Sequence, residues 1–189
     1  GTLPSYADLP KLLRDENWPA AEKVLRGAAK KKNAPADVYY NLAKVLEASG
    51  KAVQMRTWLE RAVTAKPDYA TAWFELGRCA LAQLDLRLAL RAFDRACALD
   101  PKDPDARRNL GRIALRLGIW DKATACFAED DDTEAQLARY RIASETGEDT
   151  QALRKALLAR PDDRPEVLKT LTRTAKGTIP LKLPQLLRT

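Results

Sequence analysis

The stretch that decides the fold is residues 36–103, where two segments of equal length align one under the other without a gap. They read ADVYYNLAKVLEASGKAVQMRTWLERAVTAKPDY (36–69) and ATAWFELGRCALAQLDLRLALRAFDRACALDPKD (70–103). A third segment, PDARRNLGRIALRLGIWDKATACF, continues in the same register from Pro104. Self-similarity with a period of 34 residues indicates a repeat protein built from stacked units.

Residues that interrupt helices divide each repeat into two predicted helices. A first apolar pattern of helical period breaks at Gly50, Leu84 or Gly118, a second follows, and Pro67 or Pro101 ends the repeat. The repeat is therefore predicted to be a pair of antiparallel helices.

Small and large residues mark the places where the two helices of a pair meet. Ala43, Gly77 and Gly111 recur at one position, where a small side chain lets paired helices approach closely. We expect the large rings of Trp73 and Phe93 to be buried between helices.

Seven positions carry this pattern in each of the first two clear repeats and five carry it in the third. They are Tyr39, Leu42, Ala43, Gly50, Leu59, Ala62 and Pro67, then Trp73, Leu76, Gly77, Ala89, Phe93, Ala96 and Pro101, then Leu110, Gly111, Gly118, Ala123 and Phe127. With these markers the chain resembles the tetratricopeptide repeat (TPR) family. Arg107 departs from it where a large aromatic residue is expected, and Leu84 replaces a turn glycine. The resemblance implies an all-α, right-handed α-solenoid of antiparallel helix pairs, with about eleven helices.

The repeat register divides the whole chain into six segments. Asn17 is the predicted N-cap of a helix in the first of them, and the register is lost after Phe127. The segments are a divergent N-terminal repeat (1–35), three TPR units (36–69, 70–103, and 104–131 with a divergent end), a degenerate repeat with a capping helix (132–177), and an extended apolar and basic tail (178–189). We expect the tail to cover the end of the last helix pair, because a terminal repeat otherwise exposes its apolar face. The concave groove of its own or a neighbouring chain, and a further domain, are the alternative surfaces for it.

Composition argues against catalysis. The chain has 189 residues, 33 Lys and Arg, 26 Asp and Glu, and no His. It therefore cannot form a Ser-His-Asp triad, a Cys-His dyad or an imidazole metal site. Cys79, Cys97 and Cys126 lie in apolar helical stretches and are predicted to be small buried hydrophobic residues. We expect no enzymatic activity, no cofactor and no bound metal.

The sequence contains no apolar run of the roughly 20 residues that span a bilayer, and its start lacks the pattern of a signal peptide. These observations favour a cytoplasmic location. The chain begins at Gly1, and its only Met is internal. A removed signal and a larger parent protein therefore stay open as alternatives.

The resemblance implies that the first helix of each unit lines a concave face. Lys44, Arg78 and Arg112 share one position of that helix and form what we call the cation ladder. The predicted groove adds aromatic, amide and cationic neighbours of the ladder, which are Tyr40, Asn41, Phe74, Arg108, Asn109 and Arg116. These side chains suit an extended acidic peptide, so the sequence predicts a protein-interaction scaffold or adaptor with a protein or peptide partner.

Five other interpretations of the ladder and of the chain stand beside this one. The ladder could simply keep a helix face soluble. The carboxylate clamp of some TPR co-chaperones fails here, because Glu75 and Asp105 have the wrong sign for it. A net charge of +7 permits weak contact with nucleic acid or anionic membrane through the basic C-terminal region, but residues 104–149 are net acidic. A targeting or regulatory TPR domain of a larger enzyme is the main alternative, and self-association through the solenoid ends or the tail is another.

The acidic run Glu129–Asp132 lacks the alternating spacing of a calcium-binding loop. We predict instead that it begins a helix, with Asp132 or Thr133 as the N-cap and Gln136 completing a capping box.

Overall fold

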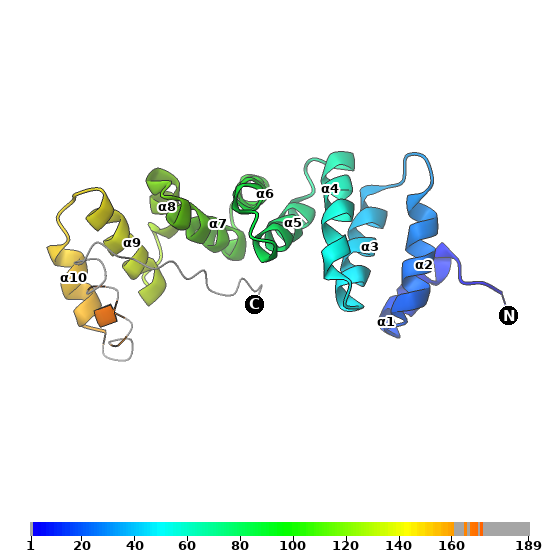
Figure 1. Cartoon of the computed structure of the whole chain (residues 1–189), viewed down its shortest axis with the longest axis horizontal. Coiled ribbons are helices and arrows are strands. Elements are labelled where there is room, and N and C mark those ends of the chain that lie inside the picture. Colours follow the sequence, from blue (N-terminus) through cyan, green and yellow to red (C-terminus); the bar gives the residue numbers. More distant parts are fainter. Residues whose placement is uncertain (1, 161–164, 166, 170, 172–189) are drawn as a thin grey trace. The chain divides into compact units, whose positions relative to one another are not determined.

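The computed structural model describes residues 2–160, 165, 167–169 and 171 (Figure 1). Every regular element in these residues is helical, with ten α-helices and two 3₁₀ helices. The all-α solenoid of helix pairs predicted from the sequence is confirmed. The chain divides into two compact units, residues 1–102 and 103–189.

The first unit contains six α-helices, each packed on the next. Its described core includes Leu25, Leu42 and Leu46, all fully buried. The elements are the 3₁₀ helix Tyr6–Asp8, α1 (Leu9–Arg14), α2 (Trp18–Ala29), α3 (Ala36–Ala48), the 3₁₀ helix Ala52–Gln54, α4 (Met55–Ala65), α5 (Ala70–Ala82) and α6 (Leu86–Leu99).

The second unit contains α7 (Pro104–Leu117), α8 (Trp120–Phe127), α9 (Thr133–Glu145) and α10 (Gln151–Leu158). Residues 165, 167–169 and 171 are also helical. Val167 and Leu171 are buried in one cluster with Tyr140 and Leu157. The tail predicted over 178–189 lies outside the described residues.

Paired helices interlock through one small and one large side chain. A Cβ added to Gly77 would lie 2.8 Å from the ring of Phe93, and one added to Gly111 would lie 2.8 Å from the ring of Phe127. Phe93 is fully buried and Trp73 is 7 % exposed, which confirms the burial predicted for both. The glycine is therefore required because the facing ring occupies the space of a methyl group.

A left-handed residue ends the first helix of every repeat. Glu16, Gly50, Leu84 and Gly118 have φ of 54°, 81°, 59° and 72° and stand 34 residues apart. The amide of the following residue donates to a carbonyl five residues back, as in the bond from Lys51 to Leu46 at 2.7 Å. This hydrogen bond is typical of the Schellman motif that closes helices.

The repeat register resumes in α9 after an interruption. Gly147, with φ of 75°, makes the same turn at the end of α9, but only 29 residues after Gly118. Thr133 therefore corresponds to Pro104, and the third repeat is five residues shorter than the others. The sequence interpretation that the register is lost after Phe127 is corrected in this respect.

Two local predictions can be checked directly. Asn17 caps α2, because its side-chain oxygen accepts a hydrogen bond from the amide of Ala20 at 3.4 Å. Cys79 and Cys126 are buried as expected, while Cys97 is half-buried.

Within the described residues, no helix combines the length and apolar character needed to cross a membrane.

Candidate functional site

The candidate site is built on the ninth residue of each first helix. Lys44, Arg78 and Arg112 hold this position in α3, α5 and α7, as the sequence predicts. Because α9 resumes the register, Arg141 holds it there. All four cations are half-buried. The structure thus supplies a fourth member of the series that sequence reasoning missed.

In the first unit, the cations are held by carboxylates of the same two helices. Lys44 Nζ lies 3.0 Å from Glu47 Oε1 and 3.5 Å from Glu75 Oε2. Arg78 donates to Glu75 through Nε at 2.9 Å and pairs with Glu47 through Nη2 at 3.0 Å. We call these four residues the α3–α5 network. Its two positive and two negative charges cancel.

The α3–α5 network is charged at neutral pH. Burial acts to raise the pKa of Glu47, but the hydrogen bond from Lys44 and the charge of Arg78 outweigh it, so the pKa is lowered. Burial acts in the same way to lower the pKa of Lys44, and Glu47 and Glu75 outweigh it, so this pKa is raised. Mutual stabilisation therefore keeps both ions in place at the surface.

The two predicted aromatic neighbours of the ladder differ in how deeply they are buried. The ring of Tyr40 is half-buried and lies 5.2 Å from that of Tyr69. Phe74, at the same helix position, is 1 % exposed and meets Phe93 edge-on at 5.4 Å. The expectation that Phe74 lines the groove is wrong. The ring of Phe93 packs against Gly77, and Phe74, about one turn before Gly77 on α5, packs against the same ring.

A small hollow lies beside Lys44. Its volume is about 310 Å³, and Asn41, Lys44 and Glu47 give it a polar edge while Leu13 and Trp18 give it an apolar wall. Asn41 is half-buried here, so its amide lies at the predicted face. Polar and apolar side chains therefore meet at this hollow.

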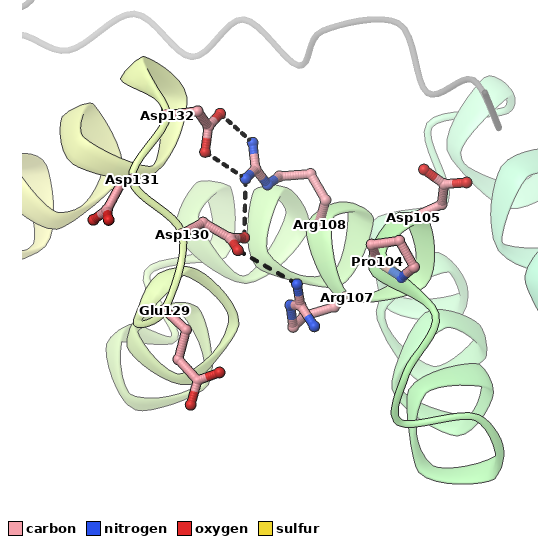
Figure 2. Close-up of a pocket in the computed structure, with 8 residues that line it drawn as sticks. All are labelled: Pro104, Asp105, Arg107, Arg108, Glu129, Asp130, Asp131 and Asp132. Atoms are coloured by element: carbon pink, nitrogen blue, oxygen red, sulfur yellow. Dashed lines mark hydrogen bonds and ion pairs between the residues drawn. The ribbon is translucent and has the colours of Figure 1, made fainter.

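In the second unit, two residues of the acidic run, Asp130 and Asp132, contact Arg108 (Figure 2). Its Nη2 donates to Asp132 Oδ1 at 2.8 Å and to Asp130 Oδ2 at 3.0 Å, and its Nη1 donates to Glu134 Oε2 at 2.9 Å. Arg107 adds a longer contact with Asp130 at 3.5 Å. Figure 2 shows Glu129 and Asp131 pointing away from Arg108.

Arg112 shares Glu134 with Arg108 and also binds Asn109. Its Nε and Nη2 donate to the two oxygens of Glu134 at 2.6 and 2.8 Å, and its Nη1 donates to Asn109 Oδ1 at 3.1 Å. Asn109 is 1 % exposed, so the amide expected to face a peptide is buried against Arg112. Arg116 is half-buried and has no hydrogen bond or ion pair within the described residues.

The capping box predicted at Asp132 is wrong. Asp132 is the N-cap of α9 by position, but its side chain makes no capping hydrogen bond, and Gln136 donates to the carbonyl of Asp131. Hydrogen bonds from Arg108 hold the carboxylate of Asp132 and lower its pKa. For Glu134, burial acts to raise the pKa, but Arg112 and Arg108 outweigh it and the pKa is lowered.

These residues border a hollow of about 470 Å³ between the start of α7 and the acidic run (Figure 2). Both signs of charge line it, from Asp105, Arg107 and Arg108 on one side to residues 129–132 on the other. Because its main cation is already bound by three carboxylates, the hollow is no simple anion site. Across the described residues, no group of three acidic or cysteine side chains is arranged to hold a metal ion.

Sequence reasoning missed the carboxylates that bind the ladder and missed Arg141. Arg78 and Glu47 stand 31 residues apart, and Arg112 and Glu134 stand 22 apart, so no local motif connects them. One signal for Arg141 was present in the sequence. Gly147 stands as far beyond Thr133 as Gly118 stands beyond Pro104, which marks the return of the repeat register.

Comparison with known proteins agrees with the repeat architecture. The chain is 33 % identical over 106 residues to the CTR9 homolog of Arabidopsis thaliana. It is 34 % identical over 118 residues to the chloroplastic TPR domain-containing protein PYG7 of the same plant. The matches cover 56 % and 60 % of this chain but only 10 % and 39 % of those relatives.

Among solved structures, the chain is similar to that of YrrB, described as a TPR protein with an unusual peptide-binding site. The TM-score is 0.71 at 19 % identity, and the match covers 87 % of this chain and 88 % of that one. Family models described as tetratricopeptide repeat match residues 36–79 and 74–135, which together make up more than half of the sequence. The chain belongs to the tetratricopeptide repeat family.

Proposed function

We propose that the chain holds an extended acidic peptide against the first helices of its repeats and acts as a non-catalytic scaffold or adaptor. Its TPR repeats make it a protein-interaction module. The observation that carries the finer proposal is the recurrence of a half-buried cation at the ninth position of α3, α5, α7 and α9.

An acidic side chain of the peptide would have to exchange with a carboxylate of the α3–α5 network. Glu47 is the residue to be displaced, because its side chain is 34 % exposed while that of Glu75 is only 8 % exposed. Partly exposed ion pairs contribute only about 0.2–1 kcal/mol. The exchange therefore costs little, and most of the affinity must come from apolar contacts at Tyr40 and in the hollow beside Trp18.

The geometry also limits the peptide motif. Neighbouring first helices pack about 10 Å apart, and an extended peptide rises about 3.3 Å per residue. Because successive side chains of an extended peptide point to opposite faces, the side chains that reach Lys44 and Arg78 should stand two or four residues apart in the peptide. The fold shared with YrrB, itself described as having a peptide-binding site, supports a peptide as the type of ligand.

The test is affinity capture followed by calorimetric titration with acidic peptides from the captured proteins. Replacing the two network cations (Lys44→Gln with Arg78→Gln) should lower the affinity by about two- to thirtyfold, which corresponds to the loss of two partly exposed ion pairs. The matched control changes two exposed α6 cations instead (Arg87→Gln with Arg95→Gln) and should have no effect. Equal affinity in both double variants would contradict the proposal.

A second variant tests the exchange with Glu47 without removing a cation. Glu47→Gln frees Lys44 and Arg78 from one competing carboxylate and should raise the affinity for the same peptide, by about threefold if the lost competition is worth about 0.6 kcal/mol. An affinity that falls or stays the same in this variant would show that peptide carboxylates do not use these cations.

A further inference from the structure

Arg141 differs from the other three cations in the positions that surround it. Three residues earlier on its own helix stands Ala138, where α5 has Glu75 and α7 has Asn109. The second acceptor of Arg78, Glu47, stands on α3, which is the first helix of the preceding repeat. For Arg141 the preceding first helix is α7, and the corresponding residue there is Leu115. Both places that supply an acceptor to Arg78 are therefore apolar for Arg141.

Within the part of the chain that the structure describes, the side chain of Arg141 has no anionic partner. Its guanidinium lies 6.0 Å from the centre of the Trp120 ring. Its Nε is buried and has no hydrogen-bond acceptor within the described residues. Its two terminal nitrogens make no hydrogen bond to any described residue and, unlike Nε, are not buried, so they reach solvent.

The charged groups around Arg141 do not neutralise it. Burial lowers its pKa. Among the described residues, the charge of Glu145 acts in the opposite direction, but Glu145 is exposed and forms no ion pair with Arg141. An arginine side chain stays protonated in proteins even so. Arg141 is thus a partly desolvated cation with unused hydrogen-bond donors, which is the state in which an incoming anion gains most.

We propose that Arg141 is a binding position for a carboxylate of the partner peptide, an inference that rests on the proposed function. The chain itself shows which anion fits this register position. At Arg112 it is a carboxylate, since both oxygens of Glu134 are bound by Nε and Nη2. At Arg141 the carboxylate would approach the two terminal nitrogens from the solvent side. The planar guanidinium matches a planar carboxylate through two parallel hydrogen bonds.

The test observes the Nε–H resonance of Arg141 by NMR while small carboxylates are added to the intact chain. N-acetylalanine presents a C-terminal carboxylate. N-acetylaspartic acid α-amide presents a side-chain carboxylate, and sodium chloride controls for ionic strength. The exposed Arg87 serves as an internal reference in the same spectra. We expect a saturable shift for Arg141 with a midpoint at least fivefold lower than that of Arg87, and the more effective of the two carboxylates identifies the source.

Leu115→Glu provides the second arm, because it places a carboxylate at the position that Glu47 has in α3. In this variant the Arg141 resonance should be shifted before any addition, and the response to added carboxylate should be lost. Three results would overturn the proposal, namely no saturable shift, the same shift with chloride, or saturation by inorganic phosphate at a lower concentration than either carboxylate. None of these outcomes depends on peptide capture, so failure here is distinguishable from failure of the proposed function.

Discussion

Two junctions between successive first helices have the same backbone register and opposite chemistry. At the junction of α3 with α5, the fifth residue of α3 is Tyr40 and the residue just before α5 is Tyr69. The centres of their rings lie 5.2 Å apart. From α7 to α9, the corresponding residues are Arg108 and Asp132, which form an ion pair at 2.8 Å. The repeat register determines which positions meet, and the side chains decide whether the contact is apolar or ionic.

This difference makes the two junctions respond differently to their surroundings. The Tyr40–Tyr69 contact gains most of its stability from apolar burial, which acid does not remove. The α7–α9 junction contains ion pairs of Arg108 with Asp130, Asp132 and Glu134. Protonation of Asp132 and Glu134 removes their attraction for Arg108. The predictions below change one junction and use the other part of the chain as its reference.

The largest effect is expected for Arg108→Ala, which leaves three clustered carboxylates without their shared cation. We expect the free energy of unfolding to fall by about 2 kcal/mol at neutral pH, since several charge-assisted hydrogen bonds are lost at a partly exposed site. Urea denaturation measures it. Arg107→Ala is the matched control, because its single 3.5 Å contact should be worth less than about 0.5 kcal/mol. Equal losses in the two variants would contradict the assigned role of Arg108.

Acidification should remove the same stabilisation in the unaltered chain. The pKa values of Asp132 and Glu134 are lowered on folding, so near their unfolded values of about 4 these groups bind fewer protons in the folded state than in the unfolded state. Their contribution is therefore complete above about pH 4 and is lost as the pH falls through the folded pKa values. Denaturation curves between pH 7 and pH 2 should converge for the unaltered chain and Arg108→Ala, and curves that stay parallel would refute this account.

A smaller effect is expected when the chemistry of one junction is moved into the other. The double variant Arg108→Tyr with Asp132→Tyr places the ring pair of α3–α5 between α7 and α9. If the two junctions share one backbone geometry, the variant should fold with a stability within about 1 kcal/mol of the unaltered chain. It should also lose most of the acid sensitivity described above. Circular dichroism and urea denaturation at two pH values decide this, and an unfolded variant would show that the backbones differ.

The sequence was sufficient for the architecture because the repeat pattern is local and periodic. The turns at Gly50, Leu84 and Gly118 and the buried rings of Trp73 and Phe93 follow from it directly. The candidate site was less accessible, since ion pairs such as that of Arg112 and Glu134 join residues that are distant in sequence and depend on side-chain conformation. The acidic run illustrates this, because the same Asp132 that suits a helix cap in sequence binds Arg108 in space.

The interlocked small and large side chains also bear on how such a chain can change by duplication and exchange. Gly77 and Phe93 belong to one repeat, and so do Gly111 and Phe127. By register, the preceding repeat pairs Ala43 with Leu59, where a smaller side chain leaves room for a methyl group. The first helix that carries Ala43 therefore suits the second helix of its own repeat, but its methyl group would clash with a second helix that carries Phe93 or Phe127. The helix pair, and not the single helix, is the unit that this chain can gain, lose or exchange intact.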